Sequence, residues 1–163
     1  METKQGGQPG FLLAQIGSHA ATKFAERLAP LKLIPADTGI LRLIRNSPGI
    51  SQQELSRRLG IHPSRLVAIL DALQEKRFVE RRANADDRRQ YSLHITDEGE
   101  EVLQSIGKVA REHQEALLAA LSAQERTILT QLLQRIAEEQ RLEAGVHPGY
   151  KRMRPEKSRG QTS

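Results

Sequence analysis

The chain has 163 residues, no cysteine, and five more Lys and Arg than Asp and Glu. The lack of cysteine excludes disulfides, thiol redox chemistry and cysteine-based metal sites. No apolar run approaches the ~18 residues of a membrane span, and the first residues lack the apolar core of a signal peptide, so we expect a single cytoplasmic domain without membrane contact.

Two helices are predicted before residue 50. From Pro9 to Leu31 the apolar residues recur at every fourth position, which places them on one helical face. The second helix is predicted to begin near Pro35, because proline favours the first turn of a helix. The sequence NSPG at residues 46–49 is expected to end it.

A helix-turn-helix is predicted to follow. Ser51 and Glu54 match a capping box, in which each side chain accepts a hydrogen bond from the other residue's backbone N–H, and Gly60 closes this short helix. The next helix has Pro63 in its first turn and one apolar face, formed by Leu66, Ile69, Leu70 and Leu73. Two helices so close together, the first short and the second amphipathic, are typical of this motif.

A charged β-hairpin is predicted after the helix-turn-helix. Phe78 and Val79 begin one strand, and residues 91–95 alternate larger apolar with polar side chains, which is the period of a half-buried strand. Residues 83–88 between the strands contain Asn and Asp, which favour a turn. A hairpin in this position is the wing of a winged helix-turn-helix.

Two long helices and a tail complete the predicted order. Thr96, followed by two acidic residues, begins one helix, and the capping box of Ser122 and Glu125 begins the other. Together with the first helix, these carry more apolar surface than a small winged domain can cover, which predicts a homodimer interface. Residues 145–163 have few apolar side chains and no period, so they are predicted to be disordered.

The predicted fold class is therefore mainly α with a small β-hairpin wing: a winged helix-turn-helix with N- and C-terminal dimerisation helices. The predicted divisions are an N-terminal arm and dimerisation helix at residues 1–34, a DNA-binding domain at 35–96, the C-terminal dimerisation helices at 97–144 and a basic tail at 145–163.

The charge is unevenly distributed along these divisions. Residues 42–96 hold eleven Lys and Arg against six Asp and Glu, and residues 145–163 hold five against one, whereas residues 97–144 hold five against ten. This asymmetry suits a polyanion at the middle segment, although it is also compatible with an ordinary solvated surface. Because aromatic residues are scarce, arginine rather than base stacking is expected to carry nucleic-acid binding.

The hairpin sequence resembles a known family. Asp87-x-Arg89, followed after five residues by Ile95-Thr96-x-x-Gly99, resembles the wing signature of the MarR family of bacterial transcription regulators, with isoleucine in place of its usual leucine. Residues 54–81 are similar to that family's helix-turn-helix, and the element order agrees from residue 11 to 142. The resemblance implies a two-fold symmetric dimer that binds a palindromic operator and is released by a small ligand.

Three features depart from the family pattern. Arg77 stands where a glycine usually closes the recognition helix, so either a non-glycine residue takes a left-handed backbone or the helix ends differently. His62 stands where a serine N-cap is common, and an imidazole caps less well. Val67 and Ala68 occupy positions that often hold polar or basic groove contacts, so we expect the operator to be read differently.

The predicted DNA contacts lie on both helices of the motif and on the wing. Arg65 can donate two hydrogen bonds to guanine, with a phosphate contact as the alternative. Arg88 and Arg89 are candidates for the minor groove, and Asp87 is expected to orient the hairpin by pairing with Arg81 or Arg89. The full set is Gln52, Gln53, Arg57 and Arg58, expected at phosphates; Ser64, Arg65, Val67 and Ala68, expected in the major groove; and Arg81, Asp87, Arg88 and Arg89 on the wing.

Other sites are less strongly indicated. The resemblance implies an effector between the winged domain and the dimer helices, where the candidates are His19, Lys23, Arg42 and His113; each has the alternative of an ordinary packed or solvent-facing residue. The sequence has no close histidine pair, Ser-His-Asp arrangement, phosphate loop or paired-carboxylate site, so neither a metal, a cofactor nor catalysis is predicted.

The main hypothesis is a ligand-responsive transcriptional repressor that binds double-stranded DNA. Two alternatives remain open: a non-specific architectural DNA-binding protein that uses the basic wing and tail, and a winged domain used for protein–protein docking. The ratio of affinities for an operator and for random DNA separates these three functions.

Overall fold

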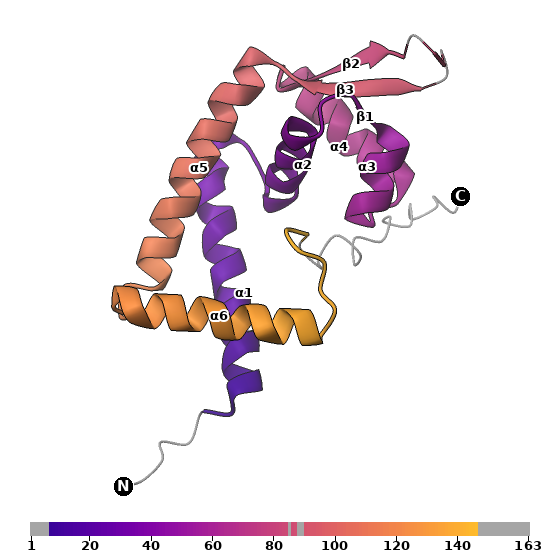
Figure 1. The fold of residues 1–163 in the computed structure, drawn as a ribbon. Coiled ribbons are helices and arrows are strands. Elements are labelled where there is room, and N and C mark those ends of the chain that lie inside the picture. Colours follow the sequence, from indigo (N-terminus) through magenta and orange to yellow (C-terminus); the bar gives the residue numbers. More distant parts are fainter. Residues whose placement is uncertain (1–6, 85, 88–89, 147–163) are drawn as a thin grey trace, which may run out of the picture.

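A winged helix-turn-helix lies beside two long helices, α1 and α5, in the computed structural model, which describes residues 7–84, 86–87 and 90–146 (Figure 1). All the predicted helices and both hairpin strands are present, which confirms the predicted fold class. The elements are α1 (Pro9–Leu28), a 3-10 turn (Ala29–Leu31), α2 (Pro35–Asn46), β1 (Ile50–Ser51), α3 (Gln52–Leu59), α4 (Pro63–Glu75), β2 (Val79–Ala83), β3 (Tyr91–Ile95), α5 (Asp97–Leu117) and α6 (Ala123–Glu139).

Helix α1 ends at Leu28, before the predicted end at Leu31. Proline lacks a backbone N–H and its ring crowds the carbonyl four residues earlier, so an α-helix does not readily continue through Pro30. The chain tightens into the 3-10 turn instead, and Lys32 closes that turn in the left-handed region with a φ of 56°.

The wing belongs to a three-stranded antiparallel sheet in the order β1-β3-β2. Strand β2 pairs with β3 along its whole length, from Val79 opposite Ile95 to Ala83 opposite Tyr91. Strand β1, which the sequence analysis did not predict, places Ile50 opposite Leu93. A strand of two residues is too short to give an alternating pattern, which is why the sequence shows only a hairpin.

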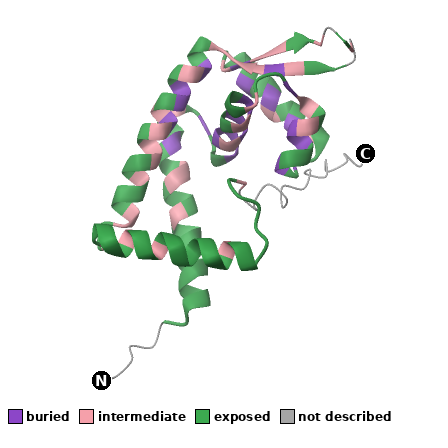
Figure 2. Ribbon diagram, in the orientation of Figure 1, coloured by how far each residue is buried: buried purple, intermediate pink, exposed green. Residues whose placement is uncertain are grey.

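The core lies inside the winged domain and at its junctions with the C-terminal end of α1 and the first half of α5 (Figure 2). It is built almost entirely of aliphatic side chains, as the shortage of aromatic residues requires. The fully buried members include Leu28, Ile40, Leu41, Ile44, Leu55, Leu66, Leu70, Leu73, Val79 and Leu93.

Helix α6 and the first half of α1 leave apolar side chains exposed. Among the described residues α6 buries none. Eight large apolar side chains on the two helices are between 37% and 62% exposed: Phe11, Leu12, Leu13 and Ile16 on α1, and Ile128, Leu132, Leu133 and Ile136 on α6. Within the described ranges, none of the helices combines the length and the apolar composition that a bilayer crossing requires.

Helix α4 ends at Glu75, and Arg77, two residues later, lies in the left-handed region with a φ of 65°. The Arg77 N–H donates to the carbonyl of Gln74 and the Phe78 N–H donates to that of Leu73, which is the hydrogen-bond pattern of a Schellman motif. Of the two alternatives left open by the sequence, the chain therefore adopts the first. An arginine takes the backbone that a glycine takes more easily, at a cost of about 1 kcal/mol.

Helix α5 meets the root of the wing through a close backbone contact at Gly99. A Cβ atom at this position would lie 2.2 Å from the carbonyl oxygen of Phe78 and 2.8 Å from Cγ2 of Ile95. Thr96 caps the helix by accepting a hydrogen bond from the Gly99 N–H, and its hydroxyl donates to the carbonyl of Arg77. The start of α5 is thereby fixed to the segment that joins α4 to β2.

Candidate nucleic-acid interface

The two helices of the motif begin with side-chain caps of different strength. The Ser51 hydroxyl accepts a hydrogen bond from the Glu54 N–H at 3.1 Å. In α4, Nδ1 of His62 accepts from the Ser64 N–H at the longer distance of 3.4 Å and lies 2.8 Å from the Ser64 hydroxyl. His62 therefore does occupy the N-cap position, with the weaker geometry expected of an imidazole.

Only half of the capping box predicted at Ser51 forms, because the carboxylate of Glu54 is held by two arginines. Glu54 Oε1 lies 2.6 Å from Nη2 of Arg57 and 2.8 Å from Nε of Arg58. Hydrogen bonds from Arg57 and then Arg58 lower the pKa of Glu54 from 4.5 to about 2. A depressed pKa means that the pairing is complete at neutral pH and is lost as the pH falls from about 4.5 towards 2.

The exposed face of α4 is small and mostly apolar. Ser64, Val67 and Ala68 are all exposed, so neither Val67 nor Ala68 faces the core. Arg65 is half-buried, and its Nε atom is buried without a hydrogen-bond partner among the described residues. The helix thus presents apolar groups suited to thymine methyls beside one guanidinium.

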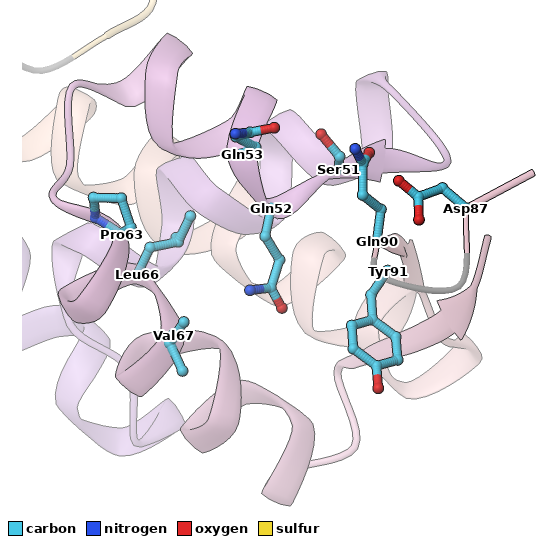
Figure 3. Close-up of a pocket in the computed structure, with 9 residues that line it drawn as sticks. All are labelled: Ser51, Gln52, Gln53, Pro63, Leu66, Val67, Asp87, Gln90 and Tyr91. Atoms are coloured by element: carbon cyan, nitrogen blue, oxygen red, sulfur yellow. The ribbon is translucent and has the colours of Figure 1, made fainter.

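A groove of about 490 Å³ separates this face of α4 from the wing (Figure 3). The amide of Gln52 reaches into the groove, between Val67 and Tyr91 (Figure 3). The groove is lined by Ser51, Gln52 and Gln53 at the start of α3, Pro63, Leu66 and Val67 of α4, and Asp87, Gln90 and Tyr91 of the wing. These groups are amides, hydroxyls, apolar surface and one carboxylate, so the groove offers neutral hydrogen-bond donors rather than cations.

The side chain of Arg81 links the wing to both helices. Its Nε donates to Oε1 of Gln52 at 2.6 Å, its Nη1 donates to Oε1 of Gln74 at 2.7 Å, and its Nη2 lies 2.7 Å from Oδ1 of Asp71. Within the described part of the chain the ion pair of Arg81 is with Asp71 on α4 and not with Asp87, which was one of the two predicted arrangements.

The turn of the wing is closed by backbone hydrogen bonds. The Asn84 N–H donates to the carbonyl of Gln90 at 3.1 Å, and the Gln90 N–H donates to the carbonyl of Asp87 at 3.0 Å. Oδ1 of Asn84 accepts from the Asp86 N–H, which is the turn chemistry expected of asparagine. Arg88 and Arg89 lie outside the described residues, and Arg89 is the other predicted partner of Asp87. The tail from residue 147 onward also lies outside them.

The four effector candidates are spread over three helices. His19 and Lys23 are exposed on α1, and Arg42 is exposed on α2. His113 on α5 is half-buried with its ring centroid 5.3 Å from that of Phe24, and burial, followed by positive charge on α1, lowers its pKa. The structure therefore brings His113 against α1, and none of the four is among the residues that line the groove.

Seven residues of the interface were not among the predicted site residues. Asp71 and Gln74 hold Arg81, and Gln90 and Tyr91 line the groove. The groove is also lined by Ser51, Pro63 and Leu66, which the sequence analysis named only for capping, for a helix start and for an apolar helix face. No sequence signal identifies Asp71 or Gln74, since the sequence does not reveal which side of α4 meets the wing. Tyr91 carries a weak signal, because it is a large aromatic residue at the turn end of an alternating strand. The structure leaves Tyr91 50% exposed.

Comparison with known proteins agrees with this arrangement. The profile of the MarR family matches residues 31–90. A protein of Thauera aromatica, named as a transcriptional regulatory protein for the hcr operon, is 32% identical over 131 residues, which are 80% of this chain and 79% of that protein.

Two solved structures extend the comparison to bound molecules. The transcriptional repressor CouR bound to a 23-mer DNA duplex matches with a TM-score of 0.71 and 32% identity, covering 84% of this chain and 99% of that one. The MarR family protein Rv2887 of Mycobacterium tuberculosis in complex with salicylic acid matches with a TM-score of 0.64 and 25% identity, covering 81% of this chain and 98% of that one.

Proposed function

Because the chain belongs to the MarR family of DNA-binding transcription regulators, we propose that it is a sequence-specific repressor that binds a palindromic operator as a homodimer and is released by a small molecule. The observation that carries the proposal is the exposed face of α4 beside a groove that the turn end of the wing helps to line. A recognition helix with a neighbouring wing is suited to contact a major groove and the adjacent backbone.

The comparisons support each half of the proposal. The CouR structure is bound to a DNA duplex, and the Rv2887 structure is in complex with salicylic acid. Homodimerisation is supported by the exposed apolar faces of α1 and α6, which a second copy of the chain would bury. We expect the protein to act in the cytoplasm, where bacterial DNA lies, with His19, Lys23, Arg42 and His113 as the candidates for contacting the effector.

Selection from a pool of random DNA duplexes tests the proposal. We expect the full-length chain to enrich an inverted repeat with half-sites separated by one helical turn, ~10 bp, or a multiple of it. Its affinity for the selected operator should exceed that for random DNA by a factor of about 10³ or more. Uniform binding would favour the architectural alternative, and no binding would favour protein docking. Adding salicylic acid to the operator complex then tests release.

The substitution Arg65→Ala is expected to relax base choice at one position in each half-site. A bidentate contact to guanine contributes about 1–3 kcal/mol of discrimination, which is absent for an alanine. The measurement is the affinity for the selected operator and for operators changed at single positions. An equal loss for every sequence would instead make Arg65 a phosphate contact, the alternative that its half-burial leaves open.

The substitution Glu54→Gln is expected to tighten binding to any duplex by about threefold to tenfold at low salt, since it releases Arg57 and Arg58 from a carboxylate that now neutralises them. The dependence of log affinity on log salt should steepen by up to ~0.9 for each arginine that reaches a phosphate. Glu138→Gln, on α6, removes the same charge outside the helix-turn-helix and serves as the control. An unchanged slope would show that neither arginine reaches the DNA.

A further inference from the structure

Arg81 is held by three protein groups at a position where the sequence suggested a contact to DNA. Its side chain is 18% exposed, and three of its N–H groups meet acceptors on α3 and α4 within 2.7 Å. These acceptors are two amide oxygens and a carboxylate from three separate residues. A guanidinium so engaged is better suited to fix the orientation of its neighbours than to neutralise a phosphate.

The contact with Gln52 has a directional consequence. A guanidinium only donates hydrogen bonds, so the amide of Gln52 must turn its oxygen towards Arg81. The NH₂ group of the same amide is then directed away from Arg81, and in Figure 3 it lies on the side of Val67, over the groove. Without Arg81 the amide is free to rotate and to present either its oxygen or its nitrogen to the groove.

We propose that Arg81 is a positioning residue for DNA binding: it locks the Gln52 amide with its NH₂ group facing the groove, where that group donates to a backbone phosphate oxygen. This inference rests on the proposed function. Through Asp71 and Gln74 the same guanidinium ties β2 to α4, so that the groove keeps one width. Arg81 therefore acts on DNA through Gln52, and its own charge stays paired with Asp71.

The salt dependence of binding distinguishes positioning from a direct phosphate contact. We expect Arg81→Ala to weaken binding to the selected operator about tenfold while the slope of log affinity against log salt stays unchanged, because no phosphate-bound cation is lost. A direct contact predicts that the slope falls by ~0.9. Arg82→Ala is the matched control: Arg82 is the next residue on β2, is 60% exposed and pairs with Glu80. Its loss removes the same charge without releasing the Gln52 amide, so it should weaken operator binding by less than Arg81→Ala does at the same salt concentration.

A double-mutant cycle tests the coupling between the two side chains. Gln52→Ala should also cost about tenfold, and the double variant about tenfold rather than a hundredfold, since both changes remove the same donor. Gln52→Glu keeps the acceptor for Arg81 but replaces the NH₂ group by an oxygen, so it should bind at least as weakly as Gln52→Ala. Additive losses, or a Gln52→Glu variant that binds like the unmodified protein, would overturn the proposal.

A measurement without DNA covers the case in which Arg81→Ala folds poorly. In ¹⁵N-labelled protein the Arg81 Nε–H should exchange slowly with water, and Gln52→Ala, which leaves Arg81 in place, should make it exchange fast. Fast exchange in the unmodified protein would overturn the lock. If the unmodified protein shows no preference for any operator, the proposed function fails and this inference with it; if it shows one and the cycle is additive, only the inference fails.

Discussion

The Gly99→Ala protein is expected to lose about 3 kcal/mol of its free energy of unfolding or more, although the change adds a single methyl group. The new Cβ would lie 2.2 Å from the carbonyl oxygen of Phe78, a backbone atom that no rotamer change can move away. Overpacking of this kind forces backbone shifts that cost about 1–3 kcal/mol, and occasionally more. Here the shift must also separate α5 from the root of the wing. Equilibrium unfolding in urea, followed by circular dichroism, measures the loss.

Gly107→Ala provides a matched control on the same helix. A Cβ at position 107 would meet the flexible end of Arg111 at 3.5 Å, which is ordinary contact. Alanine is the better helix former by up to ~1 kcal/mol, so this variant should be slightly more stable than the unmodified protein. If both substitutions had the same effect, the contact at Gly99 would not fix α5 to the wing.

Leu132→Asp on α6 is expected to weaken dimerisation by at least a hundredfold and to abolish operator binding at nanomolar concentration. Leu132 is 47% exposed on the apolar face of α6. If that face is covered by a second chain, the substitution buries two unpaired carboxylates in a symmetric interface, at a cost of several kcal/mol. About 3 kcal/mol corresponds to the hundredfold change. Sedimentation equilibrium of the variant and the unmodified protein measures it.

The control for this prediction is Gln134→Asp, which adds the same charge to an exposed residue two positions further along α6. Successive helical residues are separated by about 100°, so residue 134 lies away from the apolar face and should tolerate the charge. The prediction fails if the Leu132→Asp protein still sediments as a dimer at micromolar concentration, or if the unmodified protein is itself a stable monomer.

Local signals in the sequence predicted most of the helix boundaries. Thr96 and Ser122 begin α5 and α6 as their caps indicated, and Glu125 completes its capping box. At Ser51 the same sequence pattern gave only one of the two hydrogen bonds, because two arginines within four residues compete for Glu54. A capping pattern indicates only which backbone N–H groups are available to the side chains. A nearby guanidinium binds a carboxylate more strongly than a backbone N–H does.

The candidate site was predictable in part. The exposed face of α4 follows from helical periodicity, which leaves Val67 and Ala68 outside the core. The groove and the contacts of Arg81 do not follow from periodicity, because they join residues far apart in the chain. Arg81 and Gln52, for example, are separated by 29 positions. The acceptors that Arg81 reaches depend on how β2 packs against α3 and α4, and this packing cannot be predicted from local sequence patterns.

Helix α5 spans the distance from the wing to α6. Its 21 residues have a length of about 31 Å, with the Gly99 contact near one end and the turn into α6 at the other (Figure 1). A tilt of about 5° about the wing end would move the start of α6 by about 3 Å. In a dimer joined through α6, that tilt would change the distance between the two recognition helices while every base-contacting side chain kept its place. In such a dimer the affinity for an operator would then fall because the half-site spacing no longer matches, and substitutions along α5, far from DNA, would change that affinity.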